Sequence, residues 1–236
     1  MIRKGVISEI EREFGRVSDR LSEQVIKQFG NDIGGREEDI SAGLKTELTL
    51  NLLNNIKKRL NRKTINNVQF KVEVFRKKTE SITGADLGFV LKIVHGENVV
   101  KKGFLAQSKV CDKKKPKKGN FYYYCPPRAA NVHSNVLKQA DAMLNYTSDS
   151  FFFLYTKDGV KVVPAFSIKL NGKRGVDTRD FYFRHFRFFM KDFFKCFVGD
   201  HKVGKMMDFG EKHLLSDDFM NDQFVYLIDI EAKIIK

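Results

Sequence analysis

Apolar residues recur at spacings of three and four through the first quarter of the chain. In residues 6-29 they are Val6, Ile10, Phe14, Val17, Leu21 and Val25, and Gly30 follows. In residues 37-61 they are Ile40, Leu44, Leu48, Leu52, Ile56 and Leu60, followed by basic residues. This period places the apolar side chains on one face of a helix. The pattern therefore predicts two amphipathic helices.

From residue 68 the period changes to two, which is typical of strands. VQFKVEVF, residues 68-75, alternates as a half-buried strand does, and residues 83-110 read as two strands around a turn centred on Gly96-Glu97. A turn centred there pairs residues of the two strands whose residue numbers add up to 193. This register pairs Leu87 with Ala106, Phe89 with Phe104 and Ile93 with Val100, and it places these apolar side chains on one face. The opposite face then receives Asp86 across from Gln107. Lys109 follows on that face about 7 Å along the strand, and Gly88 and Gly103 are expected to leave room beside them.

The remaining chain predicts further helices and strands. A basic and aromatic loop at 111-127 precedes a helix near 131-146 and two strands, SFFFLYT and VKVVPAF. DFYFRHFRFFMKDFFKCF, residues 180-197, is expected to be helical, and QFVYLIDIEAKII a last strand. This order indicates an α/β fold. We expect an N-terminal helix at 1-30 and one domain at 31-236, with its core at about 36-165 and a C-terminal extension at 166-236.

Composition narrows the choice of partner. The 236 residues are 42% hydrophobic, enough for a core, and their formal net charge of +14 favours a polyanion, either nucleic acid or an anionic membrane surface. The charged start lacks a signal-peptide core, and no apolar run approaches the roughly 20 residues of a membrane-spanning helix. Cys111, Cys125 and Cys196 form no CxxC pair and are odd in number. They predict unpaired cysteines in a cytoplasmic protein.

The polar end of the hairpin has the residue types of a metal site. Divalent cations such as Mg²⁺ prefer oxygen ligands, which the carboxylate of Asp86, the amide of Gln107 and the carbonyl of Ser108 would supply. Lys109 would position or polarise a nucleophile, and a helix acid would complete the site. Taken singly, Asp86 could instead bond its own turn, and Lys109 could be a solvated lysine at a strand end.

REEDISAGL, TGADLGF and FLAQSKV together resemble the motifs of the PD-(D/E)xK, or restriction-endonuclease-like, nuclease superfamily. LKQADAML and SFFFLYT extend the similarity to a bacterial group with a glutamine-bearing helix and an aromatic strand. The resemblance covers roughly residues 36-165. It departs from many members at Gln107, where they have an acid, although some active members resemble this chain in using Gln.

The resemblance implies the superfamily core, a helix, three antiparallel strands, a helix and a strand, and an Mg²⁺-dependent nuclease in which Mn²⁺ can substitute. Its implied catalytic residues are Glu38, Asp86, Gln107 and Lys109, and its implied metal ligands are Glu38, Asp86, Gln107 and Ser108. Glu37 and Glu47 remain alternatives to Glu38. DNA is the expected substrate, as for an endonuclease effector of bacterial antiviral defence, with RNA left open. A catalytically silent module of the same fold, binding nucleic acid or a protein, is the alternative function.

Several positions allow both a functional and a structural interpretation. The lysines of KKKPKK could hold a phosphate backbone or form a solvated charge run: Lys113, Lys114, Lys115, Lys117 and Lys118. Gln139 could face the site or the solvent. Tyr122, Tyr123 and Tyr124 could stack on bases or border the core, whereas the phenylalanines of 180-197 are expected in the core. The N-terminal helix is expected to cover its apolar stripe with a second copy or a partner defence subunit, or with its own core.

Overall fold

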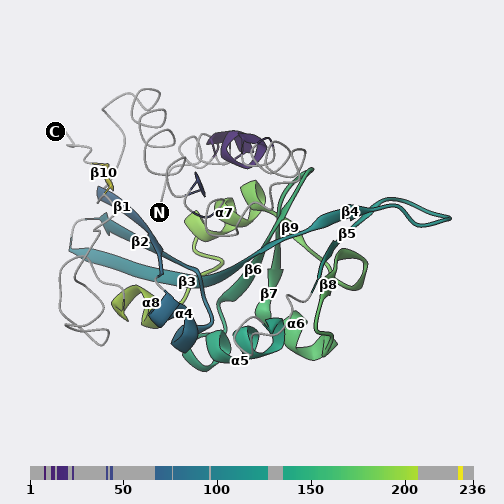
Figure 1. The fold of residues 1–236 in the computed structure, drawn as a ribbon. Coiled ribbons are helices and arrows are strands. Elements are labelled where there is room, and N and C mark those ends of the chain that lie inside the picture. Colours follow the sequence, from purple (N-terminus) through teal and green to yellow (C-terminus); the bar gives the residue numbers. More distant parts are fainter. Residues whose placement is uncertain are drawn as a thin grey trace.

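The computed structural model describes residues 67-126 except 76 and 96, residues 135-206 and 228-230, and helical positions 8, 12, 13, 15-20, 23, 41, 43 and 44. The described positions within 6-29 and 37-61 are helical, as the spacing predicts. Glu37, Glu38 and Glu47 lie outside the described residues, as do most positions of both predicted helices. The chain has a mixed α/β fold (Figure 1).

A seven-stranded sheet with the order β10-β1-β2-β3-β6-β7-β9 forms the centre of the fold. The first three strands among the described residues are β1 (Asn67–Val74), β2 (Leu87–His95) and β3 (Asn98–Val110), which pair as an antiparallel meander. β6 (Ser150–Thr156) runs parallel to β3, and β7 (Gly159–Pro164) returns antiparallel to β6. The short strands β9 (Arg184–His185) and β10 (Ile228–Ile230) complete the sheet at β7 and β1.

The predicted register of the hairpin is confirmed. Leu87 pairs with Ala106, Phe89 with Phe104 and Ile93 with Val100, and His95 pairs with Asn98 across the turn. The rings of Phe89 and Phe104 stack with their centroids 4.5 Å apart. Alternating apolar residues therefore specify the register, because a slip of one residue would move every ring to the other face.

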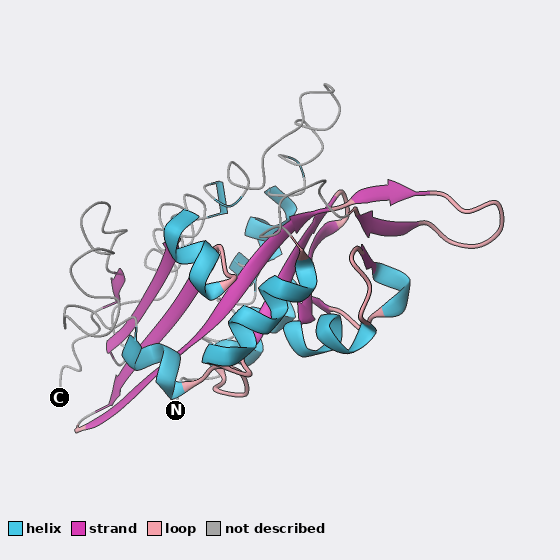
Figure 2. Cartoon of the chain, turned by 60° about the horizontal axis from the view of Figure 1, so that its bottom comes forward, coloured by secondary structure: helices cyan, strands magenta, loops and turns pink. Residues whose placement is uncertain are grey.

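Helices cover both faces of the sheet (Figure 2). The first core cluster joins the side of β2 and β3 that bears Phe89 and Phe104 to α7 (Phe186–Phe194). The second cluster joins Val90 and Leu105, on the opposite side, to α5 (Val136–Tyr146) and α6 (Ala165–Asn171). α4 (Lys77–Thr83) precedes β2, and α8 (His201–Met206) adjoins β3. Both faces of the central strands are therefore buried.

Two glycines of the hairpin were expected to leave open space, and one of them does not. The position of a Cβ on Gly103 would lie 2.8 Å from Cγ1 of Val203 and 2.5 Å from the carbonyl oxygen of Phe89. α8 therefore fills the space that the sequence predicted to be open beside Gly103. That prediction is wrong at Gly103 because a helix from the C-terminal extension packs there.

The basic and aromatic segment is a β-ribbon and not the predicted loop. β4 (Asp112–Lys114) pairs antiparallel with β5 (Tyr122–Cys125), and β5 pairs with β8 (Val176–Asp177) in a second, three-stranded sheet. We call residues 112-125 the arm. It projects from the body of the molecule beyond β3 (Figure 1).

The helix expected over 180-197 is confirmed only at its centre. The 3₁₀ helix η3 (Thr178–Asp180) and strand β9 precede α7, which ends at Phe194. Pairing of Arg184 and His185 with β7 withdraws these residues from the helix. The phenylalanines at 186, 189 and 193 lie in the core as expected, whereas Phe197 is 78% exposed.

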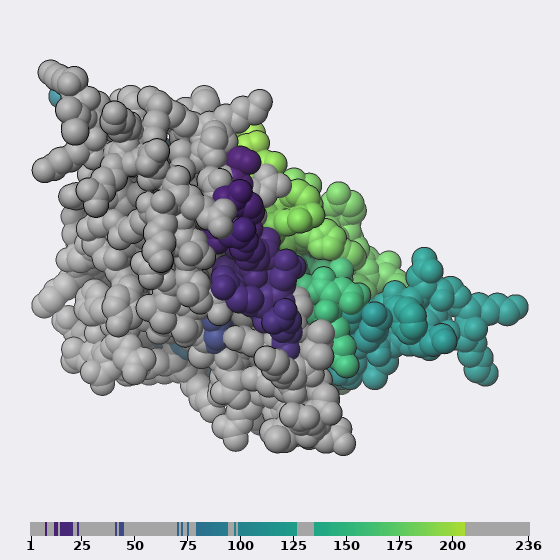
Figure 3. Space-filling model, turned by 90° about the horizontal axis from the view of Figure 1, so that it is seen from above, coloured from purple at the N-terminus to yellow at the C-terminus, as the bar shows by residue number. Residues whose placement is uncertain are grey.

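The described residues of the N-terminal helix pack on the chain's own core. Val17 is fully buried in the first cluster, and the backbone N–H of Val160 donates to Oγ of Ser18 over 3.3 Å. A Cβ on Gly15 would lie 3.5 Å from the side chain of Arg187 on α7. Figure 3 shows this segment in purple alongside the green chain. Residues 15-18 of the N-terminal helix are therefore covered by the chain's own core. Contact of the rest of this helix with a partner or a second copy remains a prediction.

The prediction of unpaired cysteines is wrong for two of the three. Cys111, which follows β3, forms a disulfide with Cys125 at the end of β5, and Cys196 is free and exposed. A separation of 14 residues does not indicate pairing in the sequence, because only the ribbon brings the two thiols together. Within the described part of the chain, no helix is long and apolar enough to cross a membrane.

Candidate functional site

The TGAD turn is built to place Asp86 at the start of β2. Gly84 has φ +71°, and its N–H donates to the carbonyl of Glu80 over 2.7 Å as α4 ends. A Cβ at Gly84 would lie 2.4 Å from the carbonyl oxygen of Gln139, so both the backbone angle and the contact with α5 require glycine. Oγ1 of Thr83 accepts a 3.2 Å hydrogen bond from the N–H of Ala85. The turn is therefore closed by Thr83, which leaves Asp86 available to β3.

Asp86 is joined to β3 through backbone and side chain. Its N–H donates to the carbonyl of Ala106 over 2.9 Å, and its own carbonyl accepts from Phe75 over 2.7 Å. Its carboxylate oxygen Oδ2 accepts from Nε2 of Gln107 over 2.7 Å and from the N–H of Ser108 over 2.8 Å. The structure therefore brings Asp86 and Gln107 together as the register predicts.

In the side-chain amide of Gln107, Nε2 donates hydrogen bonds, but Oε1 accepts none from the described residues. The side chain is 1% exposed, and Nε2 donates to Asp86 and to the carbonyl of Ser108, the latter over 3.3 Å. Its Oε1 is buried with no hydrogen-bond partner among the described residues. A buried unsatisfied oxygen costs about 1-3 kcal/mol. It is a natural position for a ligand that accepts electron density, such as a cation.

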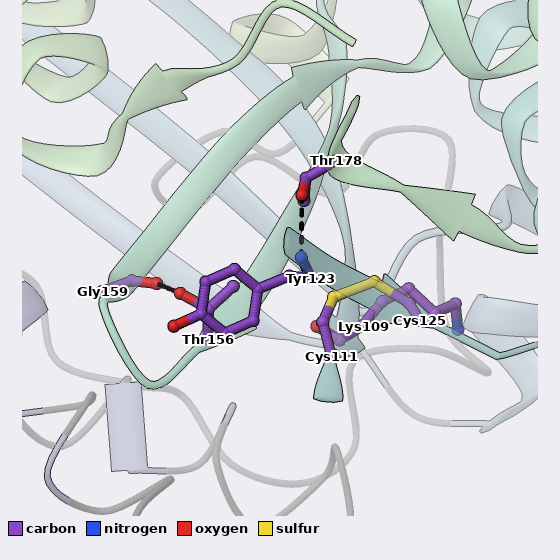
Figure 4. The surroundings of a disulfide bond; sticks show 7 residues. All are labelled: Lys109, Cys111, Tyr123, Cys125, Thr156, Gly159 and Thr178. Carbon is purple, nitrogen blue, oxygen red and sulfur yellow. Dashed lines mark hydrogen bonds between the residues drawn. A yellow bond between two sulfur atoms is a disulfide. The ribbon is translucent and has the colours of Figure 1, made fainter. Parts of the chain in front are cut away.

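Lys109 lies on the same face of β3 as Gln107, because alternate residues of a strand share a face. It is 6% exposed, so the solvated lysine at a strand end is excluded. The carbonyl of Lys109 lies 3.8 Å from Sγ of Cys111, and Figure 4 shows the side chain beside the disulfide. A lysine is seldom this buried without a structural or chemical role.

A buried hydroxyl cluster lies on the other face of β3, and the sequence did not indicate it. Oγ of Ser108 lies 3.0 Å from Oγ of Ser41 and 3.2 Å from the hydroxyl of Tyr155, and the last two are 3.4 Å apart. Ser41 belongs to the REEDISAGL segment. The cluster therefore attaches this helical residue to the strand that bears Gln107 and Lys109.

Gln139 is 4% exposed on α5, so its interpretation as a surface residue is wrong. Its Oε1 is a second buried oxygen without a hydrogen-bond partner among the described residues. The helix turn that bears it touches Gly84, two residues before Asp86. Gln139 therefore faces the protein interior beside the TGAD turn.

The donor set suits a hard cation. A carboxylate, an amide oxygen and a backbone carbonyl are the ligand types of Mg²⁺, and Asp86, Gln107 and Ser108 offer them within one short stretch. No group of three His, Cys, Asp or Glu side chains that could hold a metal occurs among the described residues. The acid expected from Glu38 is outside them, so a larger carboxylate set remains a prediction.

Two cations from elsewhere in the chain contact aromatic rings of the arm, Arg179 at Tyr122 and Lys161 at Tyr123. The guanidinium of Arg179 lies 3.6 Å from the ring centre of Tyr122, and Lys161 lies 4.1 Å from that of Phe183. Lys161 is 7% exposed, and burial lowers its pKa. Tyr123 is buried in the second cluster, as the structural interpretation allowed. Sequence reasoning missed Lys161 and Arg179, because their partners lie far from them along the chain.

Comparison of the chain with protein-family models, with curated proteins and with solved structures gives no match.

Proposed function

We propose that the protein is a metal-dependent nuclease with a restriction-endonuclease-like core. The observation that supports this best is the joining of Asp86 to Gln107 at the hairpin end, with the buried Lys109 on the same face of β3. The strands β1, β2 and β3, the helix α5 and the strand β6 parallel to β3 follow the order that the resemblance implies, with α4 inserted before β2 and the strands of the arm before α5. Mg²⁺ is the proposed cofactor, with Mn²⁺ as a substitute.

The proposed ligands are the carboxylate of Asp86, Oε1 of Gln107 and the carbonyl of Ser108, with Glu38 as the proposed helix acid. The amide of Gln107 now presents Nε2 to Asp86. A half-turn of this amide would exchange Nε2 for Oε1 and direct two oxygens to one point. A bound cation would then be the partner that the buried Oε1 lacks among the described residues, and it would offset the repulsion between the two neighbouring oxygens.

Hydrolysis requires a water oxygen to attack phosphorus while the bond to the leaving oxygen breaks and that oxygen gains a proton. When bound, Mg²⁺ supplies stabilisation of the negative charge on the phosphoryl oxygens. Lys109 would orient the attacking water and stabilise the hydroxide as its proton passes to solvent, and solvent would return a proton to the leaving oxygen. An ammonium in a poorly hydrated position does this better than one in bulk water, because its field is less screened.

One observation favours the alternative of a catalytically silent module that binds nucleic acid or a protein. The Asp86 carboxylate is satisfied by the Gln107 amide and the Ser108 N–H, a pairing that needs no cation. In that case Gln107 would have a structural role in place of the acid found in many superfamily members. The two functions differ in a direct test of cleavage.

Incubation with supercoiled plasmid, linear duplex, single-stranded DNA and RNA, each with Mg²⁺, Mn²⁺ or chelator, tests the proposal. We expect cleavage of DNA with either metal and none with chelator. Asp86→Asn and Lys109→Met should abolish it. Asp141→Asn and Lys138→Met, at exposed positions of α5, are the matched controls and should leave it unchanged. Unchanged cleavage in both site variants would refute the site, and no cleavage of any substrate would favour the silent module.

A further inference from the structure

The arm has a rigid base and a free tip. At the base, β8 pairs with Tyr124 and Cys125, and the disulfide joins Cys125 to Cys111. The N–H of Tyr123 also donates to Oγ1 of Thr178 over 2.9 Å (Figure 4). From Lys114 outwards the chain projects into solvent, as the ribbon and space-filling views both show (Figures 1 and 3).

The arm is strongly basic. Residues 112-121 contain five lysines and one acid, Asp112, so their formal charge is five minus one, or +4. Lys114 pairs with Asp112 over 3.3 Å and Lys113 with Asp158 over 3.6 Å. Both pairs are well exposed to solvent, and such pairs contribute little energy. The lysines therefore remain available to a polyanion.

An aromatic ring organises the lysines near the tip. Phe121 is 55% exposed, and the ammonium groups of Lys113 and Lys115 lie 4.9 Å and 5.7 Å from its ring centre. Phe121 belongs to neither buried core cluster, so its ring is close to these ammonium groups without being part of the core. Cation–π contacts at exposed sites contribute about 0.5-1 kcal/mol each, so they favour this placement of two positive charges on the ribbon.

We propose that the arm inserts into the major groove of B-form duplex DNA. A two-stranded ribbon is about as wide as the major groove, about 12 Å, and too wide for the minor groove, about 6 Å. Lys118 is four steps along the chain from Lys114, so a fully extended chain between them spans at most about 13 Å at 3.3 Å per step, more than the groove depth of about 8.5 Å. The five lysines lie on the outgoing strand and at the tip, and residues 119-125 contain none, so the lysines would lie against one of the two phosphate backbones.

The proposal also predicts that the arm binds duplex DNA and not duplex RNA. The major groove of A-form RNA is deep and too narrow for side chains to read, so a ribbon cannot enter it. Single strands have no groove. The inference deepens the proposed function by naming duplex DNA as the substrate class, and it rests on that function only for the claim that bound DNA is cut.

Fluorescence anisotropy with chelator present measures binding without cleavage. We expect the protein to bind a short DNA duplex at least about tenfold more tightly than the RNA duplex of the same sequence or either single strand. Serine at Lys113, Lys114, Lys115, Lys117 and Lys118 should remove this preference. It should also reduce the slope of log affinity against log salt by about 0.9 for each phosphate that the variant no longer neutralises. The control variant has serine at five other exposed lysines: Lys138, Lys169, Lys195, Lys202 and Lys205. It should keep the preference.

A second measurement identifies the groove. Duplexes whose pyrimidines bear bulky C5 substituents, which fill the major groove, should bind at least about tenfold more weakly. A minor-groove ligand added to the unmodified duplex should have no effect. Equal binding to duplex DNA, duplex RNA and single strands would overturn the proposal, as would displacement by the minor-groove ligand alone. Because chelator prevents metal-dependent cleavage, a failure here is distinct from a failure of the nuclease assay.

Discussion

Replacement of Asp86 by alanine should destabilise the fold as well as remove a proposed metal ligand. The carboxylate accepts hydrogen bonds from Nε2 of Gln107 at 2.7 Å and from the N–H of Ser108 at 2.8 Å. Gln107 and Ser108 are 1% and 0% exposed, whereas Asp86 is partly exposed, so water replaces the lost acceptor only in part. A hydrogen bond to a charged group contributes about 1.5-3 kcal/mol. The two together give a loss of about 3-6 kcal/mol, against about 5-15 kcal/mol for a whole domain.

Asp86→Asn separates the structural effect from the chemical one. The amide oxygen of asparagine can still accept from both donors, and neutral hydrogen bonds are roughly half as strong as charge-assisted ones. We therefore expect Asp86→Asn to cost about half as much as Asp86→Ala. Its lost negative charge should still abolish metal-dependent cleavage.

The assay is urea unfolding of the wild type, Asp86→Ala and Asp86→Asn, with Asp141→Ala and Asp141→Asn as controls. Asp141 forms an ion pair with Lys169 in which both side chains are half exposed, so its variants should lose less than about 1 kcal/mol. If Asp86→Ala costs no more than Asp141→Ala, the carboxylate does not hold β3 in solution, and the reasoning fails. Equal costs for the alanine and asparagine variants of Asp86 would also contradict it.

Two further predictions concern Gln107 and Lys102. Gln107→Glu should increase Mg²⁺ affinity in the free protein, because a carboxylate adds a negative ligand where the amide is neutral; equal affinities in calorimetric titration would show that Gln107 is not a ligand. Burial lowers the pKa of Lys102 from 10.5 to about 8, so the unfolded chain holds this proton at higher pH than the folded one. The stability of the wild type relative to Lys102→Met should therefore rise by about 2 kcal/mol between pH 7 and 9.5, and parallel urea-unfolding profiles would refute this.

Local patterns predicted the parts of the fold in which neighbours in sequence are neighbours in space. The hairpin is the clearest case, because alternation in two adjacent strands determines both its register and the meeting of Asp86 with Gln107. The arm was not predicted, because a lysine run interrupted by Pro116 has little strand propensity of its own. It forms a ribbon through contacts with Val176, Asp177 and Thr178, about fifty residues later.

The helix predicted over residues 180-197 is shorter than expected, also because of contacts with residues distant in the sequence. The aromatic spacing favours a helix throughout, but Arg184 and His185 pair with Val162 and Lys161 of β7. The sheet satisfies their backbone groups, so the helix begins only at Phe186. The burial of Lys102 is likewise a tertiary effect, since its ammonium donates to the carbonyls of Phe193 and Val198. No local signal distinguishes it from an exposed lysine on a strand.

β3 connects the candidate site to the arm directly, because only Cys111 lies between the end of β3 and the start of β4. Gln107 and Lys109 lie near its end, the disulfide follows at Cys111, and β4 begins at Asp112. Lys113 is four steps along the chain from Lys109, about 13 Å if the chain is extended. A duplex held by the arm would therefore meet the site within a few base pairs of the occupied groove, because each base pair advances about 3.4 Å. The position of the cut relative to the bound groove would then be determined by the length of one strand, since the disulfide and β8 prevent the base of the arm from bending away.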